Sequence, residues 1–139
     1  MSVELPEGYQ PSPEEEYMCP EHIEYFRQKL VVWREELMAE AQETLNNLRD
    51  KSYQEVGDEA DRANRESEHG LELRTRDRYR KLIRKIEKAM ERMEDGSYGY
   101  CEDTGDEIGL GRLEARPIAT LSIDAQERRE MKEKVLADR

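Results

Sequence analysis

The chain has 139 residues, 34 acidic and 23 basic, which gives a formal net charge of −11. This length suits a single domain of ordinary size. Charged residues make up 41% of the chain and hydrophobic residues 35%, and no apolar run approaches the roughly 20 residues of a membrane helix. The acidic balance also argues against free-standing DNA or RNA binding, because phosphate contacts need a basic face. We therefore expect a protein that binds neither membrane nor DNA directly.

Residues 1–19 are expected to form an irregular leader that packs near the globular body. Prolines such as Pro6 and Pro11 interrupt any helix there, and the segment lacks the basic and apolar regions of a secretory signal. The chain has only two cysteines, Cys19 and Cys101. Because two cysteines do not make a disulfide framework, we expect the protein in the reducing cytoplasm.

Two long helices are predicted, over about residues 20–49 and 59–94. Apolar residues recur on both at alternating intervals of three and four, which is the spacing of a coiled-coil seam. Helices of similar length joined by a short turn, here around Gly57, fold back antiparallel. We therefore predict a coiled-coil hairpin over residues 20–95, with its tip at about 50–63. The seam residues are Ile23, Phe26, Leu30, Trp33 and Leu37 on the first helix, and Tyr79, Ile83, Ile86, Met90 and Met93 on the second.

The C-terminal part, residues 96–139, is predicted to be a small α/β globular domain. Its glycine-rich segment 96–116 indicates a short β-hairpin with its turn at residues 103–106. Asp124, followed three residues later by Glu127, has capping-box spacing and predicts a last helix over about residues 125–136. The expected fold class is therefore mainly α, a long antiparallel coiled-coil hairpin plus this domain.

Residues that could support catalysis are scarce. The histidines are His22 and His69, and the Glu66-x-x-His69 spacing typical of di-iron bundles occurs once, where such sites need it twice. Cys19 and His22 lie near one predicted helix start, but two ligands do not close a zinc site. We therefore expect no enzyme activity and no catalytic residues.

Two charged groups lie on the second helix. Asp58, Glu59 and Asp61 cluster at the predicted tip, where they either cap the helix or form an acidic probe on a stiff arm. A basic cluster follows toward the base of the hairpin, and is either a solvated face or a docking face for an acidic or phosphate-bearing partner. The cluster consists of Arg74, Arg76, Arg78, Arg80, Lys81, Arg84, Lys85 and Lys88.

Over roughly residues 9–139 the chain resembles the DksA branch of the DksA/TraR family of RNA polymerase regulators. The resemblance is carried by DEADRA at 58–63, LELRTRDR at 71–78, KLIRKIEK at 81–88, YGYC at 98–101, EIG at 107–109 and RLEARP at 112–117. It implies a hairpin that enters the polymerase secondary channel and a globular domain that stays outside. It further implies regulation of initiation with ppGpp in the stringent response, repressing rRNA promoters and activating some biosynthetic promoters without binding DNA.

The resemblance also implies three groups of site residues. These are the coiled-coil tip, Asp58, Asp61 and Ala63; the contacts with the polymerase rim, Arg78 and Leu82; and the ppGpp-facing residues, Lys85 and Arg116. The expected partners are accordingly RNA polymerase and ppGpp, with the protein itself a monomer.

The zinc-finger pattern of the family, two Cys-x2-Cys pairs, is degenerate in this chain. The four positions hold Cys101, Thr104, Ser122 and Ala125, and hydroxyl groups are poor zinc ligands. We therefore expect no zinc, no metal site and no tightly bound cofactor, with ppGpp acting only as a co-regulator at the polymerase interface. Gln126 stands where the family often has a basic residue, which implies a weaker phosphate contact.

Two alternatives from other functional classes stay open. One is a Gre-like transcript-cleavage factor, which shares the channel and the acidic tip; the DksA-like returning helix and C-terminal body argue against it. The other is a non-regulatory coiled-coil interaction protein. The retained Asp58 and Asp61 favour the regulator over this second alternative.

Overall fold

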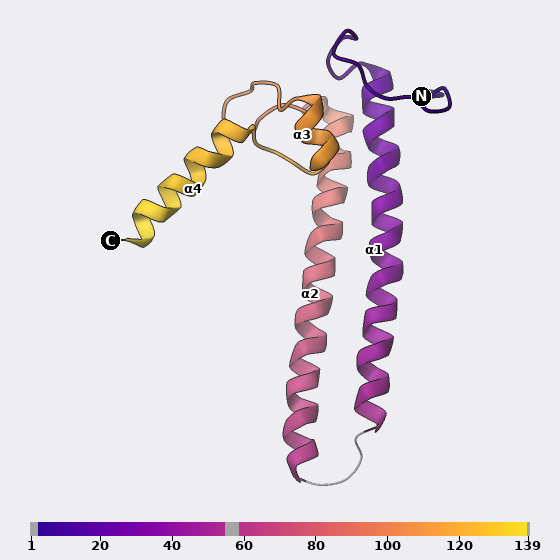
Figure 1. Cartoon of the computed structure of the whole chain (residues 1–139), viewed down its shortest axis with the longest axis vertical. Coiled ribbons are helices and arrows are strands. Elements are labelled where there is room, and N and C mark those ends of the chain that lie inside the picture. Colours follow the sequence, from indigo (N-terminus) through magenta and orange to yellow (C-terminus); the bar gives the residue numbers. More distant parts are fainter. Residues whose placement is uncertain (1–2, 55–58, 139) are drawn as a thin grey trace. The chain divides into compact units, whose positions relative to one another are not determined.

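The structure, a computed structural model, describes residues 3–54 and 59–138, without the side chains of residues 51–65. These residues form four helices, α1 (Pro20–Gln54), α2 (Glu59–Asp95), α3 (Leu110–Ala115) and α4 (Ile123–Ala137) (Figure 1). The chain divides into two compact units. Unit 1 comprises Met1–Leu30 and Glu87–Arg139, and unit 2 comprises Val31–Ile86. Both long helices contribute to both units.

In unit 2, α1 and α2 run antiparallel. The Tyr79 hydroxyl donates a hydrogen bond of 3.0 Å to the Glu40 carboxylate. Farther along α1, the guanidinium of Arg49 lies 3.6 Å from the carboxylate of Glu72. The partner positions on α2 decrease as those on α1 increase, so the predicted helical hairpin is confirmed.

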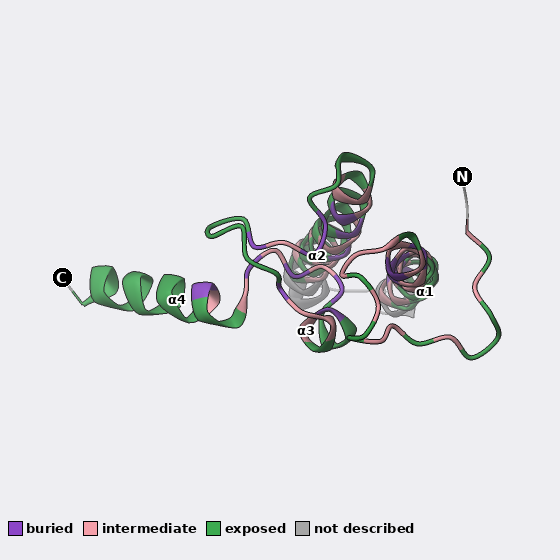
Figure 2. Ribbon diagram, turned by 90° about the horizontal axis from the view of Figure 1, so that it is seen from above, coloured by how far each residue is buried: buried purple, intermediate pink, exposed green. Residues whose placement is uncertain are grey.

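The predicted seam supplies much of the buried surface of the long helices. Burial of large apolar side chains is the main stabilising contribution, at about 1.5–3 kcal/mol for each fully buried Leu, Ile or Phe. Figure 2 shows buried positions along α1 and α2, whereas α4 is exposed beyond its first turn. The buried seam residues are Phe26, Leu30 and Leu37 on α1 and Tyr79 and Ile86 on α2, joined by Leu45 and Ala89.

The predicted β-hairpin is reduced to a single antiparallel bridge, between Tyr100 and Glu107, in the described part of the chain. After the bridge, Gly109 adopts a φ of 101°, which turns the backbone out of the extended conformation. The Leu113 amide then donates to the Gly109 carbonyl at 3.1 Å, and the segment continues as α3. Leu113 itself is fully buried, so the short helix contributes to the core of unit 1.

The start of α4 corrects the predicted cap. Ser122 is the N-cap residue, because its hydroxyl accepts a hydrogen bond of 3.2 Å from the Ala125 amide. Asp124 lies two positions after the cap, inside the first turn, where its carboxylate still interacts favourably with the helix dipole. The capping-box assignment to Asp124 and Glu127 was therefore wrong.

The leader is tied to the body of unit 1 by one tyrosine. The Tyr17 hydroxyl donates to the Gly99 carbonyl at 2.6 Å and accepts from the Gly109 amide at 2.9 Å. Gly99 has a φ of 91°, and a Cβ placed there would come within 2.8 Å of the Met18 side chain. The leader therefore packs against a backbone position that only glycine suits.

Gly99→Ala is expected to lower the free energy of unfolding by about 2–4 kcal/mol, because backbone strain and overpacking add at this site. Urea unfolding measures the loss. Gly105→Ala is the matched control, since Gly105 also has a positive φ but a Cβ placed there would meet no atom within 4 Å; it should cost only the strain, about 1–2 kcal/mol. Equal losses in the two variants would contradict the packing at Gly99.

Candidate functional site

The predicted tip falls largely outside the described residues. Asp58 is not described at all. Asp61 and Ala63 lie in the first two turns of α2, but their side chains are not described. The acidic tip therefore remains a prediction from the sequence.

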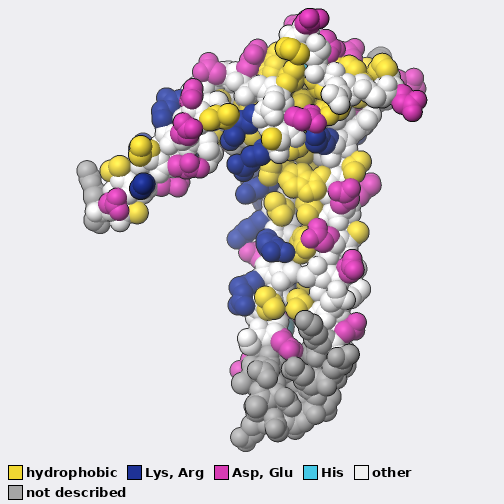
Figure 3. All heavy atoms as spheres, viewed as in Figure 1, with side chains coloured by type: hydrophobic (Ala, Val, Ile, Leu, Met, Phe, Trp, Pro, Cys, Tyr) yellow, Lys and Arg dark blue, Asp and Glu magenta, His cyan; other side chains and the backbone are white. Residues whose placement is uncertain are grey.

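The basic cluster lies on α2 and is exposed at every position. Figure 3 shows Lys and Arg side chains in a row along α2. Arg76 pairs with Glu72 at 2.9 Å and Lys81 with Asp77 at 2.9 Å, and these contacts hold the pKa of both carboxyl groups below their ordinary values. Exposed pairs of this kind contribute little to stability. Within the described residues no ion pair is formed by the remaining members, Arg74, Arg78, Arg84, Lys85 and Lys88.

The predicted rim and ppGpp residues are all available on the surface of their own units. The Arg78 guanidinium lies 5.1 Å from the ring centre of Tyr79, close enough for a cation–π contact, and Leu82 is half-buried beside it. Lys85 is exposed on α2 in unit 2, whereas Arg116 is exposed at the C-cap of α3 in unit 1.

The four zinc-finger positions do not form a four-thiolate site. The Thr104 hydroxyl accepts a hydrogen bond from the Asp106 amide at 3.2 Å, while the Ser122 hydroxyl caps α4 and the Ala125 side chain offers no ligand atom. The thiol of Cys101 is 3% exposed. Its burial raises the pKa, but hydrogen bonds to the sulfur from the Thr104 hydroxyl and nearby amides outweigh this effect and lower the pKa to about 6.

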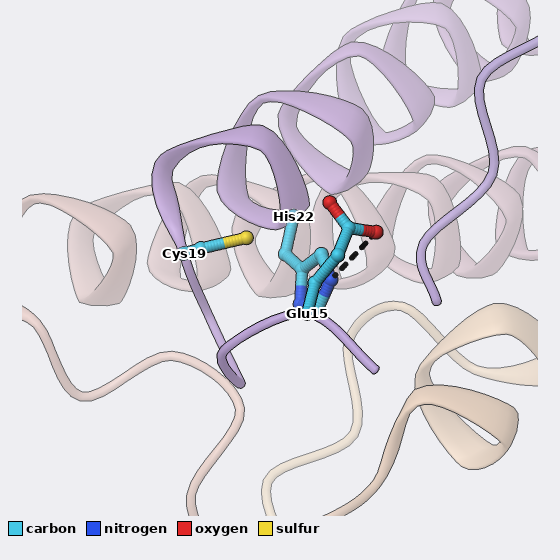
Figure 4. Close-up of side chains that lie close together, drawn as sticks. All are labelled: Glu15, Cys19 and His22. Carbon is cyan, nitrogen blue, oxygen red and sulfur yellow. Dashed lines mark ion pairs between the residues drawn. The ribbon is translucent and has the colours of Figure 1, made fainter. Parts of the chain in front are cut away.

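A second set of metal-ligating side chains lies where the leader meets α1. Glu15, Cys19 and His22 place one ligand atom each within 4.8 Å of one another. In Figure 4 the Glu15 carboxylate points toward the His22 ring, and the Cys19 sulfur lies on the same side of the helix start. The sequence drew attention to Cys19 and His22. Glu15 was missed because its approach depends on how the irregular leader folds back.

Comparison with known proteins identifies the family. Residues 22–93 match the model of the N-terminal domain of DnaK suppressor protein DksA, and residues 96–130 match the prokaryotic dksA/traR C4-type zinc finger. The chain belongs to the DksA/TraR family. In line with the resemblance seen in the sequence, its relatives cover nearly the whole chain, and the mainly helical fold recurs in a solved relative.

Three relatives illustrate the match. The RNA polymerase-binding transcription factor DksA of Caulobacter vibrioides is 55% identical over 94% of this chain and 91% of its own length. The protein of the same name from Escherichia coli is 47% identical over 94% of this chain and 86% of its own length. The structure of transcription factor DksA2 from Pseudomonas aeruginosa covers 90% of this chain and 94% of its own, with 42% identity and a TM-score of 0.76.

The expectation of no zinc and no tightly bound cofactor was wrong. Residues 96–130 match a zinc-finger family, although Cys101 is the only cysteine among them. In addition, Glu15, Cys19 and His22 form a candidate metal-binding group where the leader meets α1. Metal binding in this protein therefore has to be considered away from the finger positions.

None of the helices in the described residues is both long enough and apolar enough to cross a membrane.

Proposed function

We propose that this protein binds RNA polymerase and regulates transcription initiation. The support is the near-full-length similarity to factors named for RNA polymerase binding. In this proposal the helical hairpin enters the secondary channel of the polymerase, and the protein acts without contacting DNA. The net charge of −11 agrees with that last point, because DNA phosphates repel an acidic protein.

The exposed cations of α2 supply the chemistry for docking. Arg78 and Leu82 are the proposed contacts with the rim of the channel. An arginine beside a half-buried leucine combines a charge with apolar surface, and arginine is enriched at the energetic centres of interfaces. The unpaired Arg78 can exchange water for a carboxylate of the partner without first breaking an ion pair in the described part of this chain.

The proposed regulation is repression of ribosomal RNA promoters and activation of some biosynthetic promoters together with ppGpp. Lys85 and Arg116 are the proposed contacts with the phosphates. Each is exposed in its own unit, so each would gain most when the polymerase surface removes water from it. A charge-assisted hydrogen bond then contributes about 1.5–3 kcal/mol.

Transcription in vitro from a ribosomal RNA promoter tests the proposal. Purified protein should lower the yield of promoter-specific transcript, and ppGpp should deepen the repression. Co-sedimentation with polymerase, in the presence and absence of promoter DNA, should show binding in both cases. Absence of binding to polymerase would contradict the proposal. Binding without any effect on transcript yield would contradict its regulatory part and would mean that the protein binds polymerase without regulating it.

Lys85→Ala is expected to remove most of the ppGpp-dependent repression and to keep the ppGpp-independent part. The fold should not change, since Lys85 is exposed and makes no ion pair with any described residue. Losing one charge-assisted bond should shift the ppGpp midpoint by at least about tenfold. The measurement is a ppGpp titration of repression at the ribosomal promoter.

Lys132→Ala is the matched control, because it removes one exposed lysine from helix α4. It should leave the ppGpp midpoint unchanged. A midpoint that stays the same in Lys85→Ala, or that moves equally in both variants, would show that Lys85 does not face ppGpp.

A further inference from the structure

The imidazole of His22, in the first turn of α1, is a buried side chain whose polar atoms are not fully satisfied. His22 is fully buried, and its Nδ1 accepts a hydrogen bond of 3.2 Å from the Met18 amide. Its Nε2 has no hydrogen-bond partner in the described residues. A buried nitrogen left unpaired costs about 1–3 kcal/mol, so the arrangement is incomplete as it stands.

The nearest charged group to this nitrogen is Glu15. Its Oε1 lies 3.6 Å from His22 Nε2, beyond the length of a hydrogen bond. Two ligands of a tetrahedral zinc ion, each about 2.0–2.2 Å from the metal, are roughly 3.4 Å apart. The separation observed therefore suits two ligands of a shared ion better than it suits a direct contact.

Two hydrogen bonds from the leader orient the carboxylate of Glu15. The Ser12 amide donates to Oε1 at 2.9 Å, and the Tyr9 hydroxyl donates to Oε2 at 2.8 Å. Hydrogen-bonded carboxylates of this kind orient metal ligands in known sites. Glu15 is thus oriented before any metal arrives.

We propose that Glu15, Cys19 and His22 bind a zinc ion, with a water molecule as the fourth ligand. Carboxylate oxygen, thiolate sulfur and imidazole nitrogen are together the donor set that zinc uses, and three protein ligands plus water complete its tetrahedron. The ion would join the leader, through Glu15, to the first turn of α1, through His22. This site is separate from the finger positions, where Cys101 is the sole thiol.

Zinc binding at Nε2 requires the proton of the ring to sit on Nδ1. The Met18 amide now points at Nδ1, so the Tyr17–Met18 peptide has to rotate. Met18 has a φ of 55°, a conformation that is strained for a residue other than glycine. Rotation of that peptide returns φ to negative values and turns the Tyr17 carbonyl toward Nδ1. A backbone carbonyl that accepts from Nδ1 is the usual support of a zinc-bound histidine.

Cobalt(II) titration of the full chain, freed of metal by a chelator, tests the site. Cobalt occupies zinc sites and reports a thiolate ligand through a sulfur-to-cobalt charge-transfer band. We expect one equivalent to bind, with that band present, and zinc to displace it. Saturation without the band, or no stoichiometric binding by folded protein, would overturn the proposal.

The two cysteines provide a matched pair of variants. Cys19→Ser should lose the charge-transfer band, whereas Cys101→Ser should keep it, and circular dichroism checks that both are folded. The reverse pattern would place the metal at the finger positions and would also overturn the proposal. Neither result depends on polymerase binding.

Two further variants test the other ligand and its support. Glu15→Gln should weaken cobalt binding by more than Tyr9→Phe, which removes only the hydrogen bond behind the carboxylate and should cost about tenfold. Nitrogen NMR of His22 should show zinc on Nε2 and a proton on Nδ1. Unchanged affinity in Glu15→Gln, or zinc on neither ring nitrogen of His22, would contradict the assignment.

Discussion

Asp61→Asn is expected to fold and to bind polymerase like the parent protein, yet to lose most of its repression of a ribosomal RNA promoter. Asparagine keeps the size of the side chain and much of its hydrogen bonding, so the change removes little except the negative charge. Asp61 lies in the first turn of α2, where a carboxylate stabilises the helix by about 0.3–1 kcal/mol through the dipole. The cost in stability should therefore be small and the functional loss large. Transcript yield and polymerase affinity, measured on the same preparations, separate the two effects.

The same substitution elsewhere provides the control. Asp124 is the acidic residue in the first turn of α4, so Asp124→Asn removes the same charge from an equivalent helical position. It should regulate normally. Asp58→Asn extends the test to the residue before α2, because asparagine and aspartate cap helices about equally well. Full regulation by both tip variants would leave helix capping as the role of these acids.

The long helices were predictable because their sequence signal is repeated many times. Seam residues such as Phe26, Leu30 and Ile86 recur at heptad spacing, and each is buried in the structure. Any single substitution would leave the pattern readable. The ends were less well predicted: α1 continues to Gln54, five residues beyond the expected limit of residue 49. Arg49, Lys51 and Gln54 favour a helix by propensity but add no seam.

The connections in the C-terminal body were harder to predict because they depend on single backbone conformations. Tyr98, Tyr100 and Ile108 are typical strand residues, but positive φ at Gly99 and Gly109 interrupts extended structure on both sides of the bridge. The α3 segment has six residues, too few for a periodic pattern. The cap of α4 at Ser122 in place of Asp124 is a difference of two positions, within the usual uncertainty of helix ends.

The metal-ligand group shows a further limit of sequence reasoning. Cys19 directly precedes α1, and His22 lies three residues later in its first turn, so their proximity follows from the geometry of the helix start. Glu15 joins them only because the leader turns back, through hydrogen bonds such as the one from the Ser12 amide. No periodicity encodes such a turn. Two ligands were visible in the sequence, and the third required the folded leader.

The stability of the protein is expected to rise with pH between about 6 and 9 through the thiol of Cys101. In the folded chain hydrogen bonds from the Thr104 hydroxyl and neighbouring amides favour the thiolate over the opposing effect of burial, and the pKa is about 6, against 9.0 for an ordinary thiol. A group whose pKa is lower in the folded state contributes stability that is complete above the unfolded pKa. That contribution is lost as the pH falls through the folded pKa.

The measurement is the free energy of urea unfolding of the parent and of Cys101→Ser, in the presence of a chelator, from pH 5.5 to about 9. Serine does not titrate in this range, so the difference between the two proteins isolates the thiol. It should grow with pH by at most about 1.4 kcal/mol per pH unit and should flatten below the folded pKa. A difference that is constant over the whole range would mean that Cys101 stays a neutral thiol.

The thiol of Cys19 is expected to change the stability of the same chain with the opposite pH dependence. Burial raises the pKa of the Cys19 thiol, so its contribution is present below the unfolded pKa and is lost only as the pH rises above it. Between pH 6 and about 8 the free energy of unfolding of Cys19→Ser should therefore change with pH as that of the parent does. The free energy of unfolding of Cys101→Ser should diverge from that of the parent over the same range.

The contrast between the two cysteines has a structural cause. At Cys101 a hydroxyl and several backbone amides surround the sulfur where the family has zinc, and they favour the same charged form of sulfur that a metal would.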